Sequence, residues 1–233
     1  MKGRAGRPRR QVAAIVPAAG DSSRMGGIPK ILAPVNGLPL IGHTLRALEA
    51  CASVDEIIVA AREEDVAPIA GLCRELGLLK VSRVLVGGET RPLSVMLALT
   101  ETKAGLVAVH DGARPCVTPA LCEAVLKKAA ETGAAAPALP LSDSVKVTEG
   151  GVIARSADRS ALCTVQTPQC FEAGLLKGAL AKALQAGIEI TDDSAAVEAL
   201  PYPVHIVPGE ARNIKVTAAE DLEIVSFFLK GNS

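Results

Sequence analysis

Short runs of consecutive apolar residues recur along this chain, and they constrain its fold more than any other feature. In the run Val12-Ala13-Ala14-Ile15-Val16, no polar residue stands at every second position, as it would in a half-exposed strand. An uninterrupted apolar strand is buried on both faces, which is usual in a parallel sheet covered by helices. Comparable runs, each bounded by turn or polar residues, predict strands at residues 11–17, 56–60, 81–86, 106–110 and 134–139.

Segments with helical periodicity separate these runs. Ile41, Leu45 and Leu48 recur on one helical face, and Thr118-Pro119 is a typical helix start. Strands that alternate with helices predict parallel βαβ units, and therefore a three-layer α/β sandwich around a mostly parallel sheet. Ligands bind beyond the carboxyl ends of the strands in such sheets, so the loops after the strands are the expected place of a functional site.

The segment 141–165 departs from this alternation. Two short β-like runs, at residues 144–148 and 152–154, flank Gly150-Gly151, which is a typical hairpin turn. An isolated hairpin is only marginally stable in water. We therefore expect this segment to project as an arm and to pack on another surface, such as a partner subunit.

The length and the uniform composition predict a single domain over residues 11–233. Residues 1–10 contain five basic and no acidic residues, and we expect them to form a flexible basic tail. Near the other end, Thr217-Ala218-Ala219-Glu220 has the pattern of a capping box. This pattern predicts a final helix from that point, with Leu222, Val225 and Leu229 on one face.

Composition argues against several classes of protein. Without the tail, 20 basic residues face 25 acidic ones, and aromatic residues make up 2% of the chain, so nucleic-acid binding is not expected. The longest apolar stretches, such as 13–19 and 104–109, are far shorter than the ~20 residues that span a bilayer, and no secretion signal follows the tail. Six cysteines without a C-x-x-C pair are typical of reduced thiols, so we expect a cytoplasmic protein.

The loop after the first predicted strand, residues 17–30, is rich in small residues and contains two cations, Arg24 and Lys30. It matches neither the Walker loop nor the dinucleotide fingerprint. Small residues let backbone N–H groups approach phosphate oxygens, and the two cations supply the positive charge that a transferring phosphoryl group needs. The loop alone is equally compatible with an ordinary turn.

Two later loops add to this pattern. Gly87-Gly88-Glu89-Thr90-Arg91 follows the third predicted strand and opens a helix. Asp111 follows the fourth strand, and a carboxylate at that position is a natural ligand for Mg²⁺, which prefers one or two carboxylates together with phosphate oxygens and water. Taken alone, Asp111 could equally cap a turn.

Together these loops resemble the 2-C-methyl-D-erythritol 4-phosphate cytidylyltransferase family. The resemblance extends from Val12 to about Leu229 and rests on seven motifs in order: Pro17-Ala18-Ala19-Gly20 with Arg24-Met25-Gly26 and Pro29-Lys30, Gly87-Gly88-Glu89-Thr90-Arg91 with Ser94-Val95, His110-Asp111-Gly112-Ala113-Arg114-Pro115, Asp143-Ser144-Val145-Lys146, Gln166-Thr167-Pro168-Gln169-Cys170-Phe171, Thr191-Asp192-Asp193, and Asn213-Ile214-Lys215-Val216-Thr217.

The resemblance implies a Rossmann-like, mostly parallel sheet of the nucleotidyltransferase type, with a projecting β-hairpin arm. It further implies transfer of a cytidylyl group from CTP to 2-C-methyl-D-erythritol 4-phosphate, with release of diphosphate, in non-mevalonate isoprenoid biosynthesis. Mg²⁺ or another divalent cation is the implied cofactor. A homodimer joined through the arm is the implied assembly, with Arg114 and Ser144 serving the neighbouring subunit's site.

The resemblance also assigns roles to individual residues. It implies that Arg24, Lys30 and Lys215 surround the α-phosphate and that Asp111 holds the metal. The implied contacts to CTP are Pro17, Ala18, Ala19, Gly20, Gly88, Glu89, Ser94 and Gly112. The implied contacts to the acceptor are Arg114, Ser144, Arg159, Thr167 and Lys215.

Some residues depart from the family pattern or have a simpler explanation. Arg212 stands where some members carry an acidic residue beside the metal, so no second metal ligand is assigned. His110 is expected to pack at a strand end, and Asp192 and Asp193 to cap the following helix. Two alternatives stay open: a cytidylyltransferase that uses ribitol 5-phosphate, and a non-catalytic nucleotide-binding subunit.

Overall fold

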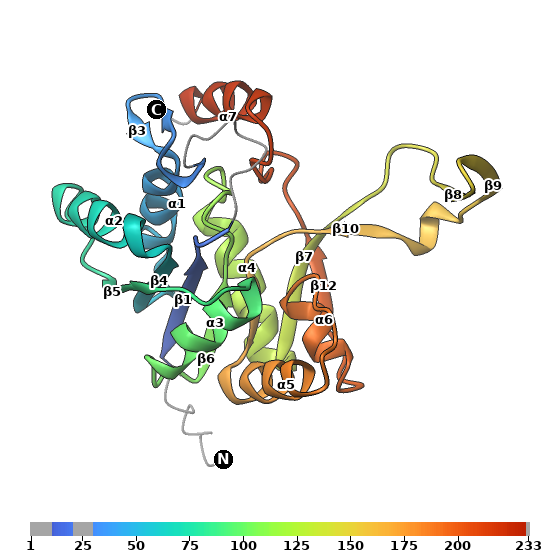
Figure 1. Ribbon diagram of the computed structural model, residues 1–233, viewed down its shortest axis with the longest axis horizontal. Helices are drawn as coiled ribbons and strands as arrows, with labels where there is room; N and C mark the ends of the chain where they lie inside the picture. The colour runs from blue at the N-terminus through green and yellow to red at the C-terminus, as the bar shows by residue number, and fades with distance from the viewer. Residues whose placement is uncertain (1–10, 21–29, 232–233) are drawn as a thin grey trace, which may run out of the picture.

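An eight-stranded mixed sheet forms the centre of the molecule, seen here in a computed structural model that describes residues 11–20 and 30–231 (Figure 1). The basic tail predicted for residues 1–10 lies outside the described residues. The strands lie in the order β10-β7-β11-β6-β1-β4-β5, and β12 pairs with β7. Their bounds are β1 (Val12–Pro17), β4 (Glu56–Ala61), β5 (Val81–Val86), β6 (Leu106–Val109), β7 (Ala134–Pro140), β10 (Cys163–Val165), β11 (Gln169–Glu172) and β12 (His205–Pro208).

The five strands predicted from the apolar runs are all present. The strand β1 pairs in parallel with both β4 and β6, and β4 pairs in parallel with β5. The pattern does not predict the other three strands of the sheet, β10, β11 and β12. Of these, β11 lies between β6 and β7 and is antiparallel to both. Its residues Cys170 and Phe171 are buried, and the strand joins β7 to the parallel part of the sheet.

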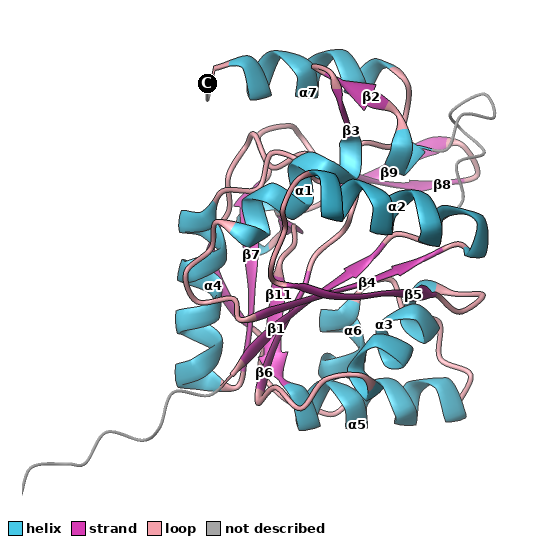
Figure 2. Cartoon of the chain, turned by 90° about the vertical axis from the view of Figure 1, so that its left-hand side faces the viewer, coloured by secondary structure: helices cyan, strands magenta, loops and turns pink. Residues whose placement is uncertain are grey.

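Helices cover both faces of this sheet (Figure 2). Alternate residues of β1 belong to two separate cores: Ala14 and Val16 pack toward α1, α2, α4 and α7, whereas Ala13 and Ile15 pack toward α3, α5 and α6. This double burial is the reason for the uninterrupted apolar run. The bounds are α1 (Leu40–Glu49), α2 (Glu63–Glu75), α3 (Arg91–Thr100), α4 (Pro119–Thr132), α5 (Ala173–Gln185), α6 (Asp193–Glu198) and α7 (Glu220–Lys230). The predicted three-layer α/β sandwich is confirmed.

The sequence predicted the starts of two helices, α4 and α7, and the structure confirms the first cap but not the second. Thr118 caps α4, because its Oγ1 accepts a hydrogen bond from the Leu121 amide at 3.1 Å. The capping box predicted at residues 217–220 is wrong: α7 begins at Glu220, and its N-cap residue Ala219 offers no side-chain cap. Instead, Thr217 donates to the carboxylate of Asp221 through its amide at 2.7 Å and its hydroxyl at 3.0 Å.

The predicted hairpin projects from the sheet as an arm (Figure 1). It consists of β8 (Lys146–Glu149) and β9 (Val152–Ser156), which pair in antiparallel fashion around Gly150-Gly151. Both glycines have positive φ, at 57° and 83°, a conformation that favours glycine in a tight turn. The apolar side chains of Val152 and Ile153 are 67% and 66% exposed, so the arm lacks a packing surface within the described part of its own chain.

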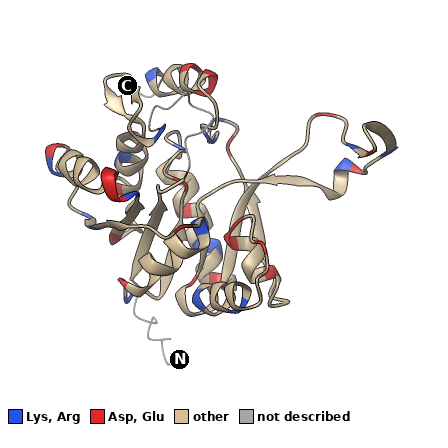
Figure 3. Cartoon of the chain, viewed as in Figure 1, with Lys and Arg blue, Asp and Glu red and all other residues tan. Residues whose placement is uncertain are grey.

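Charged residues and cysteines are distributed over the whole described part of the chain. Lys and Arg are interspersed with Asp and Glu over the helices and loops (Figure 3). All six cysteines are free, and five of them are buried, whereas Cys163 on β10 is exposed. Within the described ranges, no helix is both long enough and apolar enough to cross a membrane.

Candidate active site

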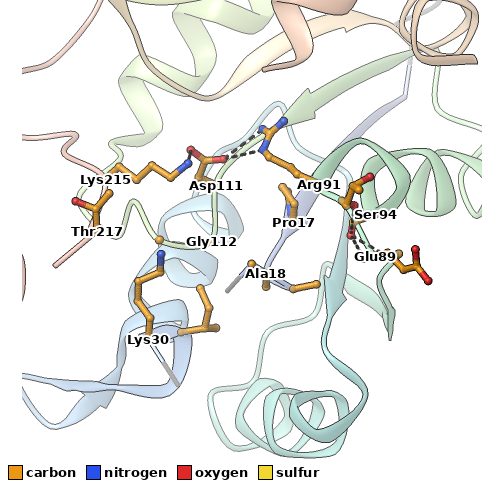
Figure 4. Close-up of a pocket in the computed structure, with 16 residues that line it drawn as sticks. Pro17, Ala18, Lys30, Glu89, Arg91, Ser94, Asp111, Gly112, Lys215 and Thr217 are labelled. Atoms are coloured by element: carbon orange, nitrogen blue, oxygen red, sulfur yellow. Dashed lines mark hydrogen bonds and ion pairs between the residues drawn. The ribbon is translucent and has the colours of Figure 1, made fainter. Parts of the chain in front are cut away.

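A cavity of about 340 Å³ opens at the carboxyl ends of β1, β5 and β6 (Figure 4). Three loops that follow these strands and the segment 209–217 form its walls. The lining residues are Pro17, Ala18, Ala19, Gly20, Lys30, Ile31, Gly88, Glu89, Thr90, Arg91, Ser94, Asp111, Gly112, Ala113, Lys215 and Thr217. The place of this cavity agrees with the prediction that ligands bind beyond the strand ends.

Backbone hydrogen bonds fix the first loop against its neighbours. The Ala18 amide donates to the Ala60 carbonyl at 2.7 Å, and the Gly87 amide donates to the Ala61 carbonyl at 2.7 Å. The guanidinium of Arg62 donates to the carbonyl of Gly20 at 2.9 Å. Backbone groups held in this way can recognise a base or a phosphate with fixed geometry and little further loss of entropy.

Close packing explains the glycines of the second loop. A Cβ atom on Gly88 would lie 2.5 Å from the Cβ of Leu93, and one on Gly87 would lie 2.7 Å from the Oγ of Ser94. Ser94 is buried, with 1% of the residue exposed. Its hydroxyl holds this turn, because it accepts a hydrogen bond from the Gly88 amide at 3.1 Å and donates one to the Thr90 carbonyl at 3.1 Å. Ser94 therefore shapes the wall of the cavity.

Three cations surround the carboxylate of Asp111, directly after β6. Its Oδ1 lies 3.2 Å from Arg91, and its Oδ2 lies 3.3 Å from Arg114 and 3.1 Å from Lys215. Burial alone would raise the pKa of Asp111, but Arg91, Lys215 and Arg114 together lower this pKa well below its usual value. The carboxylate is consequently ionised throughout the physiological pH range.

Arg91 is a site residue that the sequence reasoning did not assign. It is the first residue of α3, and its guanidinium lies between Asp111 and the buried Asp193, 2.8 Å from the latter. The motif Gly87-Gly88-Glu89-Thr90-Arg91 could have indicated this role, because it places an arginine at the start of the helix that follows β5, near the strand ends where the site is expected. Asp192 caps α6 as predicted, through the Ala195 amide at 2.9 Å, but Asp193 pairs with Arg91 and does not act as a cap.

His110 and Thr167 lie behind Asp111. His110 is fully buried, with its ring nitrogens 3.1 Å from the Arg114 carbonyl and 3.0 Å from the Thr167 hydroxyl, which confirms that it packs at the strand end. Burial lowers the pKa of His110 to about 4. The Thr167 hydroxyl accepts from the Asp111 amide at 3.1 Å, so the structure places Thr167 as a support for Asp111 outside the cavity lining.

Buried amides hold the segment that carries Lys215. The side chain of Gln166 donates to the Glu210 carbonyl at 2.9 Å, and that of Asn213 donates to the Thr167 carbonyl at 2.7 Å. Arg114 donates to the Asn213 carbonyl at 2.8 Å. These bonds bring the 209–217 segment against the Asp111 loop, although the two are far apart in the sequence.

Several predicted residues lie elsewhere. Arg24 lies outside the described residues. Ser144 and Arg159 are exposed on the arm, where Arg159 donates to the Ser142 carbonyl, and neither belongs to the cavity of its own chain. Arg114 lies beside Asp111 of its own chain, and the expectation that it serves the neighbouring subunit together with Ser144 stays a prediction.

Asp111 fits a divalent cation as a single carboxylate ligand. It is ionised and it lines the cavity. Among the described residues, no group of three or more His, Cys, Asp or Glu side chains could hold a metal. A cation here would take its other ligands from phosphate oxygens and water, which is usual for Mg²⁺. Arg212 stands where some family members carry an acidic residue beside the metal, and its guanidinium lies 5.8 Å from the centre of the Phe228 ring.

Comparison with known proteins points to one family. The family model described as 2-C-methyl-D-erythritol 4-phosphate cytidylyltransferase matches residues 12–231. A protein of that name from Pelotomaculum thermopropionicum is 41% identical over 227 residues, which is 94% of each chain, and one from Dehalococcoides mccartyi is 38% identical over 94% of this chain and 96% of its own. The crystal structure of 2-C-methyl-D-erythritol 4-phosphate cytidylyltransferase from Thermus thermophilus covers 93% of this chain and 98% of its own, with a TM-score of 0.78 at 36% identity.

Proposed function

This chain belongs to the 2-C-methyl-D-erythritol 4-phosphate cytidylyltransferase family, and we propose that the cavity beside Asp111 is where it carries out the family's reaction. The chain is a nucleotidyltransferase that transfers a cytidylyl group from CTP to 2-C-methyl-D-erythritol 4-phosphate and releases diphosphate, for isoprenoid precursor biosynthesis. The family match over residues 12–231, joined to a cavity with cations around one carboxylate, is the observation that carries this conclusion.

In this reaction the acceptor's phosphate oxygen attacks the α-phosphorus of CTP, and the bond between that phosphorus and the diphosphate oxygen breaks. No covalent bond to the protein is needed, so the chain's work is positioning and charge stabilisation. Lys30 and Lys215 line the cavity from two different segments of the chain and supply positive charge to the α-phosphate (Figure 4). Arg24, from the same loop as Lys30, is proposed to complete this set.

We propose that the loops after β1, β5 and β6 hold CTP. Pro17, Ala18, Ala19, Gly20, Gly88, Glu89 and Gly112 line the cavity, and Ser94 fixes the turn that carries Gly88. The fixed backbone of these loops supports recognition of the base and ribose. Asp111 would hold Mg²⁺, which supplies charge neutralisation for the phosphates when bound.

The acceptor contacts proposed are Arg114, Ser144, Arg159, Thr167 and Lys215. Because Ser144 and Arg159 lie on the projecting arm, their role requires a second copy of the chain whose arm reaches this cavity. The exposed Val152 and Ile153 support such a homodimer, since burying them would stabilise the arm. We further propose that residues 11–233 act as one domain and that the enzyme works in the cytoplasm.

The test is diphosphate release from CTP and Mg²⁺ by the purified chain, with 2-C-methyl-D-erythritol 4-phosphate and ribitol 5-phosphate in separate reactions. Release with the first acceptor alone is the expected result. Release with ribitol 5-phosphate alone would keep the chemistry but overturn the acceptor, and no release with either would favour a non-catalytic nucleotide-binding subunit. A size-exclusion measurement of the same sample tests the dimer.

A further inference from the structure

The guanidinium of Arg91 is shared between two carboxylates from different parts of the fold. Its Nη2 lies 3.2 Å from Oδ1 of Asp111 and 2.8 Å from Oδ2 of Asp193. Figure 4 shows Arg91 extending from the start of α3 toward Asp111. The Asp193 carboxylate is therefore the closer of the two partners of this nitrogen, although Arg91 also lines the cavity and contacts Asp111 through its Nε at 3.3 Å.

The ion pair with Arg91 is the main polar contact of the Asp193 side chain among the described residues. Its side chain is 1% exposed, and apart from the ion pair neither carboxylate oxygen has a hydrogen-bond partner among the residues that the structure describes. A buried carboxylate costs several kcal/mol unless a cation compensates it. The start of α6 does not need Asp193, because the neighbouring Asp192 already provides the cap.

The shared cation changes how strongly Asp111 is neutralised. Arg114 has a second partner in the Asn213 carbonyl, which carries no net charge, whereas Arg91 has a second acidic partner in Asp193. Without Asp193, Arg91 would pair with Asp111 alone. The negative charge of Asp111 would then be neutralised by three cations, and no second acidic side chain would share Arg91. A carboxylate so neutralised is a weaker ligand for a divalent cation.

We infer that Asp193 is a positioning residue for the transfer reaction: by holding Arg91, it keeps the Asp111 carboxylate available to the divalent cation. This inference rests on the proposed role of Asp111 as the metal ligand. It adds to that role a residue that does not line the cavity and that is linked to the metal ligand through their shared ion-pair partner Arg91.

The experiment compares Asp193→Asn with Asp192→Asn, a matched control that removes the adjacent carboxylate of α6. Binding of Mn²⁺ is measured by electron paramagnetic resonance, with a CTP analogue whose α,β bridge is a methylene group. We expect Asp193→Asn to weaken Mn²⁺ binding ~5–10-fold, a change within the range that coupled neighbours in one ion-pair network show. The KM for CTP should not rise, because the cavity becomes more positive.

The control and a double variant separate this role from a structural one. Asp192→Asn should leave Mn²⁺ affinity within about two-fold of the wild type, a change too small to reflect lost coupling. The Arg91→Gln, Asp193→Asn double variant removes the whole pair and should recover the wild-type Mn²⁺ affinity or exceed it. Circular dichroism melting curves establish that each variant is folded, and the double variant carries the test if Asp193→Asn alone does not fold.

Three results would overturn the inference: unchanged Mn²⁺ affinity in Asp193→Asn, equal weakening in Asp192→Asn, or equal weakening in the double variant. Its failure is distinct from failure of the proposed function. A wild type that releases diphosphate and binds Mn²⁺, beside an unaffected Asp193→Asn, contradicts the positioning role alone. A wild type that neither binds Mn²⁺ with the analogue nor releases diphosphate contradicts both.

Discussion

The Nζ of Lys215 lies 3.1 Å from Oδ2 of Asp111, and this pair joins the segment after β12 to the loop after β6. The side chain of Lys215 is 41% exposed, whereas that of Asp111 is 9% exposed. Lys215 thus reaches from the rim of the cavity to its floor. A partly exposed cation beside a buried carboxylate suits a site where phosphates must enter, react and leave.

Lys30 is expected to act on the reaction and not on the fold. Lys30→Ala should lower kcat ~10²–10³-fold, by analogy with the loss of one donor aimed at a transition state. Steady-state kinetics with both substrates measure this change. Lys177→Ala, on the exposed face of α5, is the control and should be unchanged. Near-normal turnover in Lys30→Ala would refute the role assigned to it.

Gly88 is expected to tolerate no side chain, because a Cβ atom there would lie 2.5 Å from the Cβ of Leu93. Gly88→Ala should shift the second loop and raise the KM for CTP by about ten-fold, which corresponds to a loss of roughly 1.4 kcal/mol in binding. The matched control is Gly178→Ala in α5, where no described atom lies within 4 Å of the added Cβ. That change should leave KM alone and stabilise the helix slightly.

His110 is expected to make stability depend on pH. Burial lowers its pKa to about 4 in the folded chain, whereas the unfolded value is near 6.5. Between these values the unfolded chain binds the extra proton, so the free energy of unfolding falls as pH drops from about 6.5 to about 4, by an amount of the order of 3 kcal/mol.

Urea unfolding in EDTA across this pH range measures the effect, and His110→Gln provides the comparison. In the variant, the free energy of unfolding should depend less steeply on pH between pH 6.5 and 4, whatever its absolute value. An unchanged slope in His110→Gln would show that other groups are responsible for the pH dependence.

Arg159 is expected to serve the acceptor from the arm of a second subunit. Arg159→Ala should raise the KM for methylerythritol phosphate with little change in the KM for CTP, because charge-assisted contacts to phosphate are lost. Lys146→Ala removes another arm cation, one that donates to Ser156 at 2.7 Å, and serves as the control. The reverse pattern, with only CTP affected, would mean that the two substrate pockets have been exchanged.

Much of the fold could be predicted because local patterns dictated it. The run at Val12–Pro17 is buried on both faces, and this burial is visible in the sequence as a missing alternation. The strand β11 was not predicted, because its antiparallel place between β6 and β7 depends on partners that are distant in the sequence. The helix α7 was predicted, but its start was not, because Thr217 pairs with Asp221 in place of forming the expected cap.

The layered sheet, the hairpin arm and the loops that carry Lys30, Gly88 and Asp111 could be read from the residues, because apolar period, turn residues and glycines act over short distances along the chain. Which charges meet depends on the folded arrangement. The contacts of Asp111 with Lys215 and of Arg91 with Asp193 join loops and helices that are remote in sequence. Such pairs depend on the packing of whole elements and on burial, which strengthens electrostatic interactions, and neither can be read from residue spacing.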